Sequence, residues 1–267
     1  MKTKSYLVYA LCAMLNSCGL VDAQVIWLST KNQDFSNCDR EERELRPFDG
    51  ITNTCPFDVI YEQSDEQYVI VEGDKEYFNR LHTDIRRGVL EISVDPARYR
   101  NVRLRVRVGS PRINQVFMNG SGSIVCKTDI VAEDNFTLGV SGSGDIVAEK
   151  IRCGNMETSV VSSGDIRVSG IEARNVAVTM SGSGDWAASF IKADNLTASI
   201  AGSGDIEIAN VQIENTLTAS VAGSGDIDIS GHAGNVNAKV VGSGDISGHL
   251  SYERISKNRS GSGDIDW

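Results

Sequence analysis

The sequence is short of several residue types, and each shortage excludes a class of protein. Its 267 residues include only 3 His and 4 Pro. The histidines, His82, His232 and His249, are too scattered along the chain for a histidine-rich metal site or a dense acid–base centre. Basic residues are also scarce, because 26 Lys and Arg stand against 36 Asp and Glu, for a net charge of −10. This balance excludes a general nucleic-acid-binding protein, which needs a basic face.

Long hydrophobic runs are missing as well. The apolar run near the start, 6–15, has about half of the roughly 20 residues that a membrane span needs. Two lysines precede it and small residues up to Ala23 follow it, a layout typical of a secretory signal peptide over residues 1–23. An alternative stays open: Leu15-Asn16-Ser17-Cys18 is similar to a bacterial lipobox, in which Cys18 would carry a lipid anchor. Either way we expect an exported protein, either secreted, periplasmic or on the outer-membrane surface.

The cysteines include no Cys-x-x-Cys pair, which argues against a zinc or redox motif. Export would place them in a compartment that permits disulfides. Cys38 and Cys55 enclose a short, irregular segment, so we expect a disulfide between them. Cys126 and Cys153 fall at positions that alternate as core, where a free thiol behaves as a small apolar side chain, and whether they pair stays open.

What the sequence does contain is one motif, Gly-Ser-Gly-Asp-Ile, repeated eight times after residue 119 with single-residue variants in three copies. A series of asparagines recurs at intervals of 20 residues. Two markers with the same period of about 20 residues indicate a solenoid. The motif occupies residues 120–124, 142–146, 162–166, 182–186, 202–206, 223–227, 242–246 and 261–265. The asparagines are Asn135, Asn155, Asn175, Asn195, Asn215 and Asn235.

Each repeat also contains two short alternations of apolar and polar residues, which predict two or three β-strands per repeat. Residues 166–168 and 176–180 show the two alternations. We therefore predict an all-β parallel β-helix with coils of about 20 residues. About seven coils stacked about 4.8 Å apart would form a rod roughly 35 Å long. We expect the glycines to allow turns with positive φ and the asparagines to form a hydrogen-bonded ladder at one corner.

The domain organisation follows from the limits of the repeat. Residues 24–119 lack the motif but contain strand-like segments and a possible helical turn at 74–81, so we interpret them as an N-terminal cap with irregular first coils. Residues 120–267 would form the regular β-helix repeats. In the last repeat Gly248, Lys257 and Arg259 occupy positions that are apolar elsewhere, which would protect the open end of the stack from edge pairing.

The sequence resembles a bacterial family, the head GIN domain of auto-transporter adhesins. The resemblance rests on the Gly-Ser-Gly-Asp-Ile series and on three earlier segments, Arg-Pro-Phe-Asp-Gly-Ile at 46–51, Phe-Asp-Val at 57–59 and Gly-Val-Leu-Glu-Ile at 88–92. It implies a right-handed, single-stranded β-helix, a secreted or outer-surface location and an adhesin-like role. It supplies no catalytic residues.

The aspartate of the motif would form a column with one carboxylate per coil. Carboxylates about 5 Å apart repel one another by about 1 kcal/mol per pair in water-like surroundings, so each needs a compensating contact. Two interpretations are open: an Asx-type turn, in which each carboxylate accepts the backbone N–H two residues on, and a row of Ca²⁺ sites. One carboxylate per coil is few for Ca²⁺, and no other cofactor is expected. The candidate ligands are Asp145, Asp165, Asp185, Asp205, Asp226 and Asp245, with Asp264 in the last repeat.

A second candidate site is a row of arginines. Arg103, Arg105 and Arg107 alternate with apolar residues and would share one face of a strand, with Arg98 and Arg100 nearby. This face could bind an acidic glycan or an acidic partner, and the alternative is a solvated outer face.

We expect a binding or structural role rather than catalysis. Parallel β-helices also include polysaccharide lyases and hydrolases, but these need a break in the repeat where carboxylates or basic residues converge. No long loop interrupts the repeats between residues 145 and 225. Such an enzyme and a Ca²⁺-stabilised surface scaffold remain the alternatives. The expected partners are a surface glycan, a protein ligand or further copies of the chain.

Overall fold

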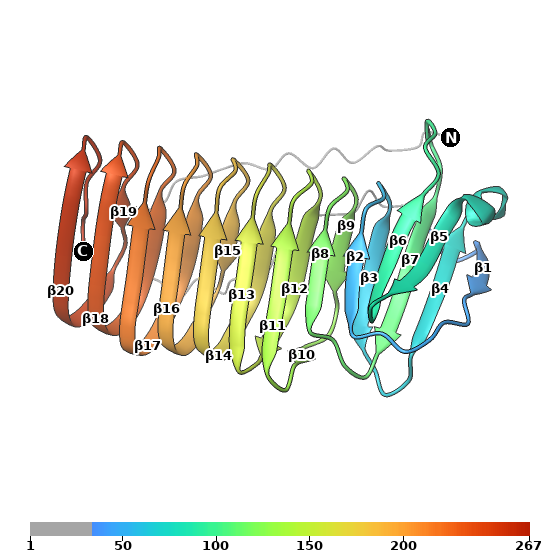
Figure 1. The fold of residues 1–267 in the computed structure, drawn as a ribbon, viewed down its shortest axis with the longest axis horizontal. Helices are drawn as coiled ribbons and strands as arrows, with labels where there is room; N and C mark the ends of the chain where they lie inside the picture. Colours follow the sequence, from blue (N-terminus) through green and yellow to red (C-terminus); the bar gives the residue numbers. More distant parts are fainter. Residues whose placement is uncertain (1–33) are drawn as a thin grey trace, which may run out of the picture.

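The protein is a rod of stacked β-coils, closed near its N-terminal end by a cap of antiparallel strands (Figure 1). The computed structural model describes residues 34–267. The segment predicted as a signal peptide, residues 1–23, and the lipidation candidate Cys18 lie outside the described residues. No helix in the described part of the chain is long and apolar enough to cross a membrane.

Parallel backbone hydrogen bonds between successive coils build the rod. Each strand residue pairs with its equivalent one repeat later, as Ile146 does with Ile166 and Ile166 with Trp186. The predicted parallel β-helix with coils of about 20 residues is confirmed, with about seven turns. Its strands are β8 (Gln115–Met118), β9 (Ser123–Cys126), β10 (Ile130–Val131), β11 (Asn135–Val140), β12 (Asp145–Arg152), β13 (Asn155–Val160), β14 (Ile166–Met180), β15 (Trp186–Ala188), β16 (Ile191–Ile200), β17 (Ile206–Val221), β18 (Ile227–Gly242), β19 (Ile246–Ser247) and β20 (Leu250–Gly261).

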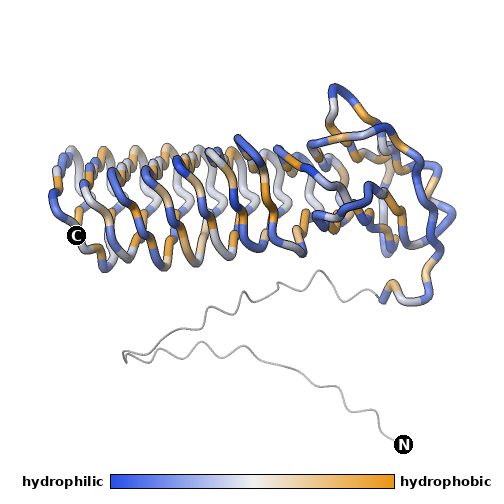
Figure 2. The backbone as a smooth tube through the Cα atoms, turned by 90° about the horizontal axis from the view of Figure 1, so that it is seen from below, coloured by the Kyte–Doolittle hydropathy of each residue, from blue (hydrophilic) through white to orange (hydrophobic). Residues whose placement is uncertain are grey.

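The alternation within each repeat directs apolar side chains into a continuous core. Ile146, Ile166, Ile206 and Ile227 are at most 1% exposed and form one column. Hydrophobic and hydrophilic stretches alternate around every coil in Figure 2. Because each coil buries the same positions, apolar burial contributes a similar stabilisation for every repeat added.

One coil carries a larger residue in the isoleucine column. Trp186 is fully buried, and its indole N–H donates a hydrogen bond to Thr158 Oγ1 at 3.0 Å. Thr158 is 3% exposed and stands between Leu138 and Val178 in its own column. A buried polar group without a partner costs about 1–3 kcal/mol, so this hydrogen bond explains how the core tolerates both residues.

The cap consists of antiparallel pairs and one short helix. β1 (Asp39–Glu42) pairs with β4 (Tyr68–Gly73), and β4 pairs with β7 (Leu104–Ser110). β5 (Leu81–Arg86) pairs with β6 (Val89–Val94). The 3-10 helix η1 (Lys75–Arg80) connects β4 to β5, where the sequence predicts a helical turn.

The chain does not build its first coils in sequence order. β2 (Gly50–Asn53) and β3 (Asp58–Gln63) form a coil that pairs in parallel with β8 and β9 on one side. On the other side the same coil pairs in parallel with β6 and β7, which come later in the chain. The chain therefore starts the rod at β2, leaves it to build the cap, and returns at β8.

The far end of the rod ends in charged residues. Lys257 pairs with Ala238, and Arg259 pairs with Val240, so charged residues replace apolar ones in the last coil as predicted. Lys257 Nζ donates to Trp267 O at 2.7 Å, and the Trp267 indole N–H donates to Ser247 O at 2.6 Å. These side chains make the edge of β20 a poor template for another strand.

The glycines of the motif allow the turns of successive coils to stack closely. A Cβ on Gly204 would lie 1.9 Å from Gly184 O in the preceding coil. Of the motif glycines, only Gly242 and Gly261 have positive φ, at 139° and 128°. The expectation of positive-φ turns is therefore wrong for most copies, and lack of space between coils is the reason that glycine recurs.

Gly204→Ala should destabilise the fold by about 2–3 kcal/mol, because its Cβ would force two turns apart. Gly170→Ala is the matched control, since a Cβ there would lie 3.7 Å from Lys150 Cγ, an ordinary contact. The control should leave stability unchanged or raise it by about 0.5–1 kcal/mol through the unfolded chain. Urea denaturation measures both effects, and equal stabilities of the two variants would contradict this account.

Candidate functional site

The aspartates of the motif form a ladder from side chain to backbone. Oδ1 of each aspartate accepts a hydrogen bond from the N–H of the aspartate one coil later, as Asp205 does from Asp226. The six contacts, from Asp145 to Asp264, measure 2.7–3.2 Å. The carboxylates therefore point along the stack.

This ladder satisfies an N–H group for which the turn supplies no backbone acceptor. Ser224 N and Gly225 N both donate to Gly202 O, at 3.1 and 3.3 Å. The next N–H, that of Asp226, donates to the Asp205 carboxylate instead. Since an amide N–H without an acceptor is costly in a packed turn, one carboxylate per coil completes the hydrogen bonding of the stack.

An equivalent contact occurs in the first coil, separated from the ladder by Ser123, since Asp145 N donates to Gly122 O at 3.2 Å. Asp58 Oδ1 accepts hydrogen bonds from Ser123 N at 3.1 Å and Ser123 Oγ at 2.8 Å. Sequence reasoning missed Asp58, although Asp58-Val59 resembles the Asp-Ile of the motif. It also assigned the wrong donor, because the N–H group belongs to the next coil and not to a residue two positions on in the same turn.

The predicted asparagine ladder is confirmed over four coils. Asn155 Nδ2 donates to Asn135 Oδ1 at 2.9 Å, and the contacts continue to Asn175 at 2.7 Å and to Asn195 at 2.9 Å. Asn215 is the exception, because a bulge pairs Thr216 with Asn195. Asn235 Nδ2 therefore donates to the Asn215 backbone oxygen, at 3.2 Å.

Side-chain clusters suited to metal binding are absent from residues 34–267. These residues hold no group of three or more His, Cys, Asp or Glu side chains that could bind a metal ion together. His232 Nδ1 lies 3.0 Å from Ser251 Oγ, but Ser251 Oγ donates to Gly231 O at 3.1 Å. His232 has no carboxylate partner within the described chain, so the pair lacks the acid that orients a catalytic base.

Asp205→Ala should destabilise the fold by about 1 kcal/mol, because it leaves Asp226 N without its acceptor. Asp205→Asn keeps an acceptor oxygen and removes one repelling charge, so it should be at least as stable as the wild type. Thermal unfolding of both variants, with EDTA and with Ca²⁺, checks this. We expect no effect of chelator; a melting temperature that falls with EDTA and recovers with Ca²⁺ would favour the Ca²⁺ interpretation of the column.

The predicted arginine row exists along β7, but its charges are paired. The arginines alternate with Leu104 and Val106, which are buried. Carboxylates from β3, from β4 and from the residue before η1 lie against them. Arg103 pairs with Asp74 at 3.1 Å, Arg105 with Glu72 at 2.6 Å and Arg107 with Glu62 at 3.5 Å. The row is therefore not a free cationic surface.

Glu72 is the central acid of this network. Its side chain is fully buried, and its second oxygen pairs with Arg40 at 3.0 Å. The Arg105 guanidinium also lies over the Phe35 ring, 4.1 Å from its centre. These contacts join β1, β4 and β7, so the arginines hold the cap together.

Glu72→Gln should destabilise the protein by about 3 kcal/mol, because it removes the anion between two cations in a buried position. Glu133→Gln is the control, since Glu133 and its partner Arg112 have side chains 76% and 75% exposed. The control should unfold at the wild-type denaturant concentration. If Glu72→Gln did the same, the network would have no structural role.

The disulfide predicted between Cys38 and Cys55 is absent, because all four cysteines of the described chain are free thiols. Cys38 precedes β1 and its Sγ donates to Phe35 O at 3.1 Å, whereas the Cys55 Sγ donates to Asn53 Oδ1 at 2.9 Å inside the first coil. Nearness in sequence does not bring them together, since the chain passes from the cap into the rod between them. Burial raises the pKa of the Cys126 thiol to about 12, as expected of a core cysteine.

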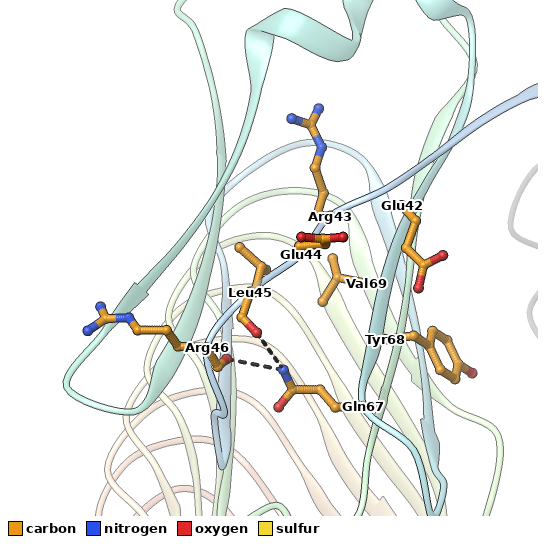
Figure 3. A pocket seen from close by; sticks show the side chains of 8 residues that line it. All are labelled: Glu42, Arg43, Glu44, Leu45, Arg46, Gln67, Tyr68 and Val69. Atoms are coloured by element: carbon orange, nitrogen blue, oxygen red, sulfur yellow. Dashed lines mark hydrogen bonds between the residues drawn. The ribbon is translucent and has the colours of Figure 1, made fainter.

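Surface hollows lie in the cap and at its junction with the coils. One of about 460 Å³ is bounded by residues 42–46 and 67–69 (Figure 3). Gln67 spans it, because its Nε2 donates to Leu45 O at 3.3 Å and to Arg46 O at 3.1 Å. Two glutamates and two arginines line the same hollow. Because these charges are mixed, the lining favours neither an anionic nor a cationic ligand. Two further grooves share Gln63, Pro111 and Val131 at the junction.

Comparisons with solved structures show the same fold in bacterial proteins. A "putative lipid binding protein" from Parabacteroides distasonis is 25% identical, with a TM-score of 0.75 over 86% of this chain and 96% of that one. A "putative adhesin" from Parabacteroides merdae is 18% identical, with a TM-score of 0.77 over 86% and 96%. Another from Bacteroides fragilis is 19% identical, with a TM-score of 0.70 over 86% and 97%.

The search of curated proteins finds no match. A family model, by contrast, covers most of the rod and part of the cap. It is described as "Putative auto-transporter adhesin, head GIN domain", it matches residues 47–233, and the chain belongs to this family.

Proposed function

We propose that this protein is exported and acts as an adhesin-like binding module without catalytic activity. The rod would present its cap and outer faces to a surface glycan or a protein ligand. Membership of an adhesin family and the signal-like residues 1–23 support export.

The regular register of the coils, which only short bulges interrupt, is the observation that carries this proposal. From β11 to β20 the strands pair with their equivalents, with register shifts only near Asn195, Val211 and Thr216. An enzyme acting on polysaccharides would need a groove in which catalytic side chains converge. The hollows described above do not provide such a convergence, whereas a rigid rod with regular outer faces suits binding.

The test is a binding screen of the purified protein against immobilised glycans, matrix proteins and lipid vesicles, with and without Ca²⁺. We expect saturable binding to a glycan or a protein without consumption of the ligand. The vesicles are included because one structural neighbour is named as a lipid-binding protein.

A parallel assay for release of reducing or unsaturated sugar ends from a polysaccharide panel checks for turnover. Turnover would replace the binding role with an enzymatic one. Absence of binding to every ligand class would leave only a structural role in the cell envelope.

A further inference from the structure

We propose that the cap carries a binding site for acidic polysaccharide, formed by Arg80, Arg98 and Arg100 around Tyr77 and Tyr99. The proposal rests on the binding role proposed above and names the ligand class and the site. The sequence-based expectation centred on Arg103, Arg105 and Arg107 with Arg98 and Arg100 nearby, whereas this proposal centres on Arg98 and Arg100 and adds Arg80 and the two tyrosines.

The site lies where the segment between β6 and β7 projects from the cap (Figure 1). This segment, residues 95–103, is anchored at both ends against η1 and the residue before it. Asp95 N donates to Arg80 O at 3.0 Å, and Arg103 N donates to Asp74 Oδ2 at 2.9 Å. The loop and the helix therefore form one surface.

Aromatic contacts hold the centre of that surface. The Tyr99 ring packs edge-on against Phe57 and Tyr77, with centroid distances of 5.4 and 6.0 Å. The Tyr99 hydroxyl donates to Asp95 O at 2.6 Å, which fixes the ring relative to the loop. Both tyrosines remain partly exposed, so positioned aromatic surface is available to pack against the apolar face of a sugar.

Three arginines next to these tyrosines have no carboxylate partner in the described chain. The Arg80 guanidinium lies over the Tyr77 ring at 5.9 Å from its centre. Arg98 and Arg100 are exposed and immediately precede and follow Tyr99 in the loop sequence. Guanidinium groups bind carboxylate and sulfate groups through two parallel hydrogen bonds. The site therefore combines charge for an anion with a stacking surface for a sugar ring.

The nearby acids do not neutralise this site. Asp74 pairs with Arg103. Asp95 contacts His82 at 2.8 Å, which compensates its charge only when the histidine is protonated. Glu76 on η1 is exposed and has no ion pair in the described chain. Even with Asp95 and Glu76 both charged, the three arginines exceed these two acids by one positive charge.

Charge along the rod favours the cap as the place where a polyanion binds. Residues 116–267 carry 10 Lys and Arg against 19 Asp and Glu, which gives −9, and the Asp ladder runs along them. The coils repel a polyanion, so it meets the protein at the arginine-bearing end. The fixed tyrosine rings favour a sugar chain as the ligand. Binding to a bilayer would require a side chain to insert into it, and these rings are held against the protein.

The experiment measures binding of the purified protein to heparin, polygalacturonate and neutral dextran, and to vesicles of phosphatidylcholine with phosphatidylglycerol. Arg80→Ser/Arg98→Ser/Arg100→Ser should weaken binding to the anionic polysaccharides about tenfold or more. The control Arg174→Ser/Lys192→Ser/Lys239→Ser removes the same charge from exposed positions on the coils and should change binding less than about twofold. Arg98→Lys/Arg100→Lys keeps the charge but not the paired donors, so its effect should be intermediate. Circular dichroism and thermal unfolding verify that each variant is folded.

Heparin and polygalacturonate separate sulfate from carboxylate recognition, and dextran should not bind. Equal losses in the cap and control variants would overturn the site, since they would show general charge attraction. Binding to anionic vesicles but to neither polysaccharide would overturn the ligand class. If the wild type binds another ligand that the cap variant also binds, this inference fails while the proposed function stands; if it binds nothing, both fail.

Discussion

Parallel hydrogen bonding at constant register is the constraint on which the structure depends. Since every residue pairs with its equivalent one coil later, any side chain in the repeat meets a copy of itself about 4.8 Å away. Only groups that tolerate this neighbour can recur. Isoleucine stacks on isoleucine, asparagine bonds to asparagine, and glycine leaves room for the carbonyl oxygen of the preceding turn. Aspartate is tolerated because each carboxylate accepts an N–H from the next coil.

The cap covers the unpaired backbone groups at the N-terminal end of the stacked coils. A coil at the end of a solenoid exposes unpaired backbone groups. Here β6 and β7 cover one side of the first coil, and antiparallel strands cover them in turn, β5 on β6 and β4 on β7. The buried carboxylate of Glu72 joins three of these strands through two arginines. Arginines paired in this way are less available to ligands than Arg98 and Arg100 in the loop between β6 and β7, which are exposed and have no ion pair in the described chain.

Regular elements could be predicted because the repeat displays the same pattern many times. The alternation around Ile166 and Val176 is seen again in neighbouring coils, so the inward positions were evident without coordinates. The candidate sites were less predictable. Charge pairing depends on which strands become neighbours, and nothing in the spacing of Arg105 indicates that Glu72 on β4 lies beside it. The bulge that displaces Asn215 and the separation of Cys38 from Cys55 are likewise properties of the folded chain.

The repeat length, the strand alternation, the core columns and the family could be derived from the order of residues along the chain, because each is a local pattern. Three features could be known only from the folded chain: the insertion of β2 and β3 between the cap and the coils, the N–H donor of each aspartate carboxylate, and the pairing of the arginines. One cause underlies all three. Hydrogen bonds and ion pairs form between groups that are neighbours in space, and in this fold the neighbours come from different coils or from strands that the chain reaches out of order.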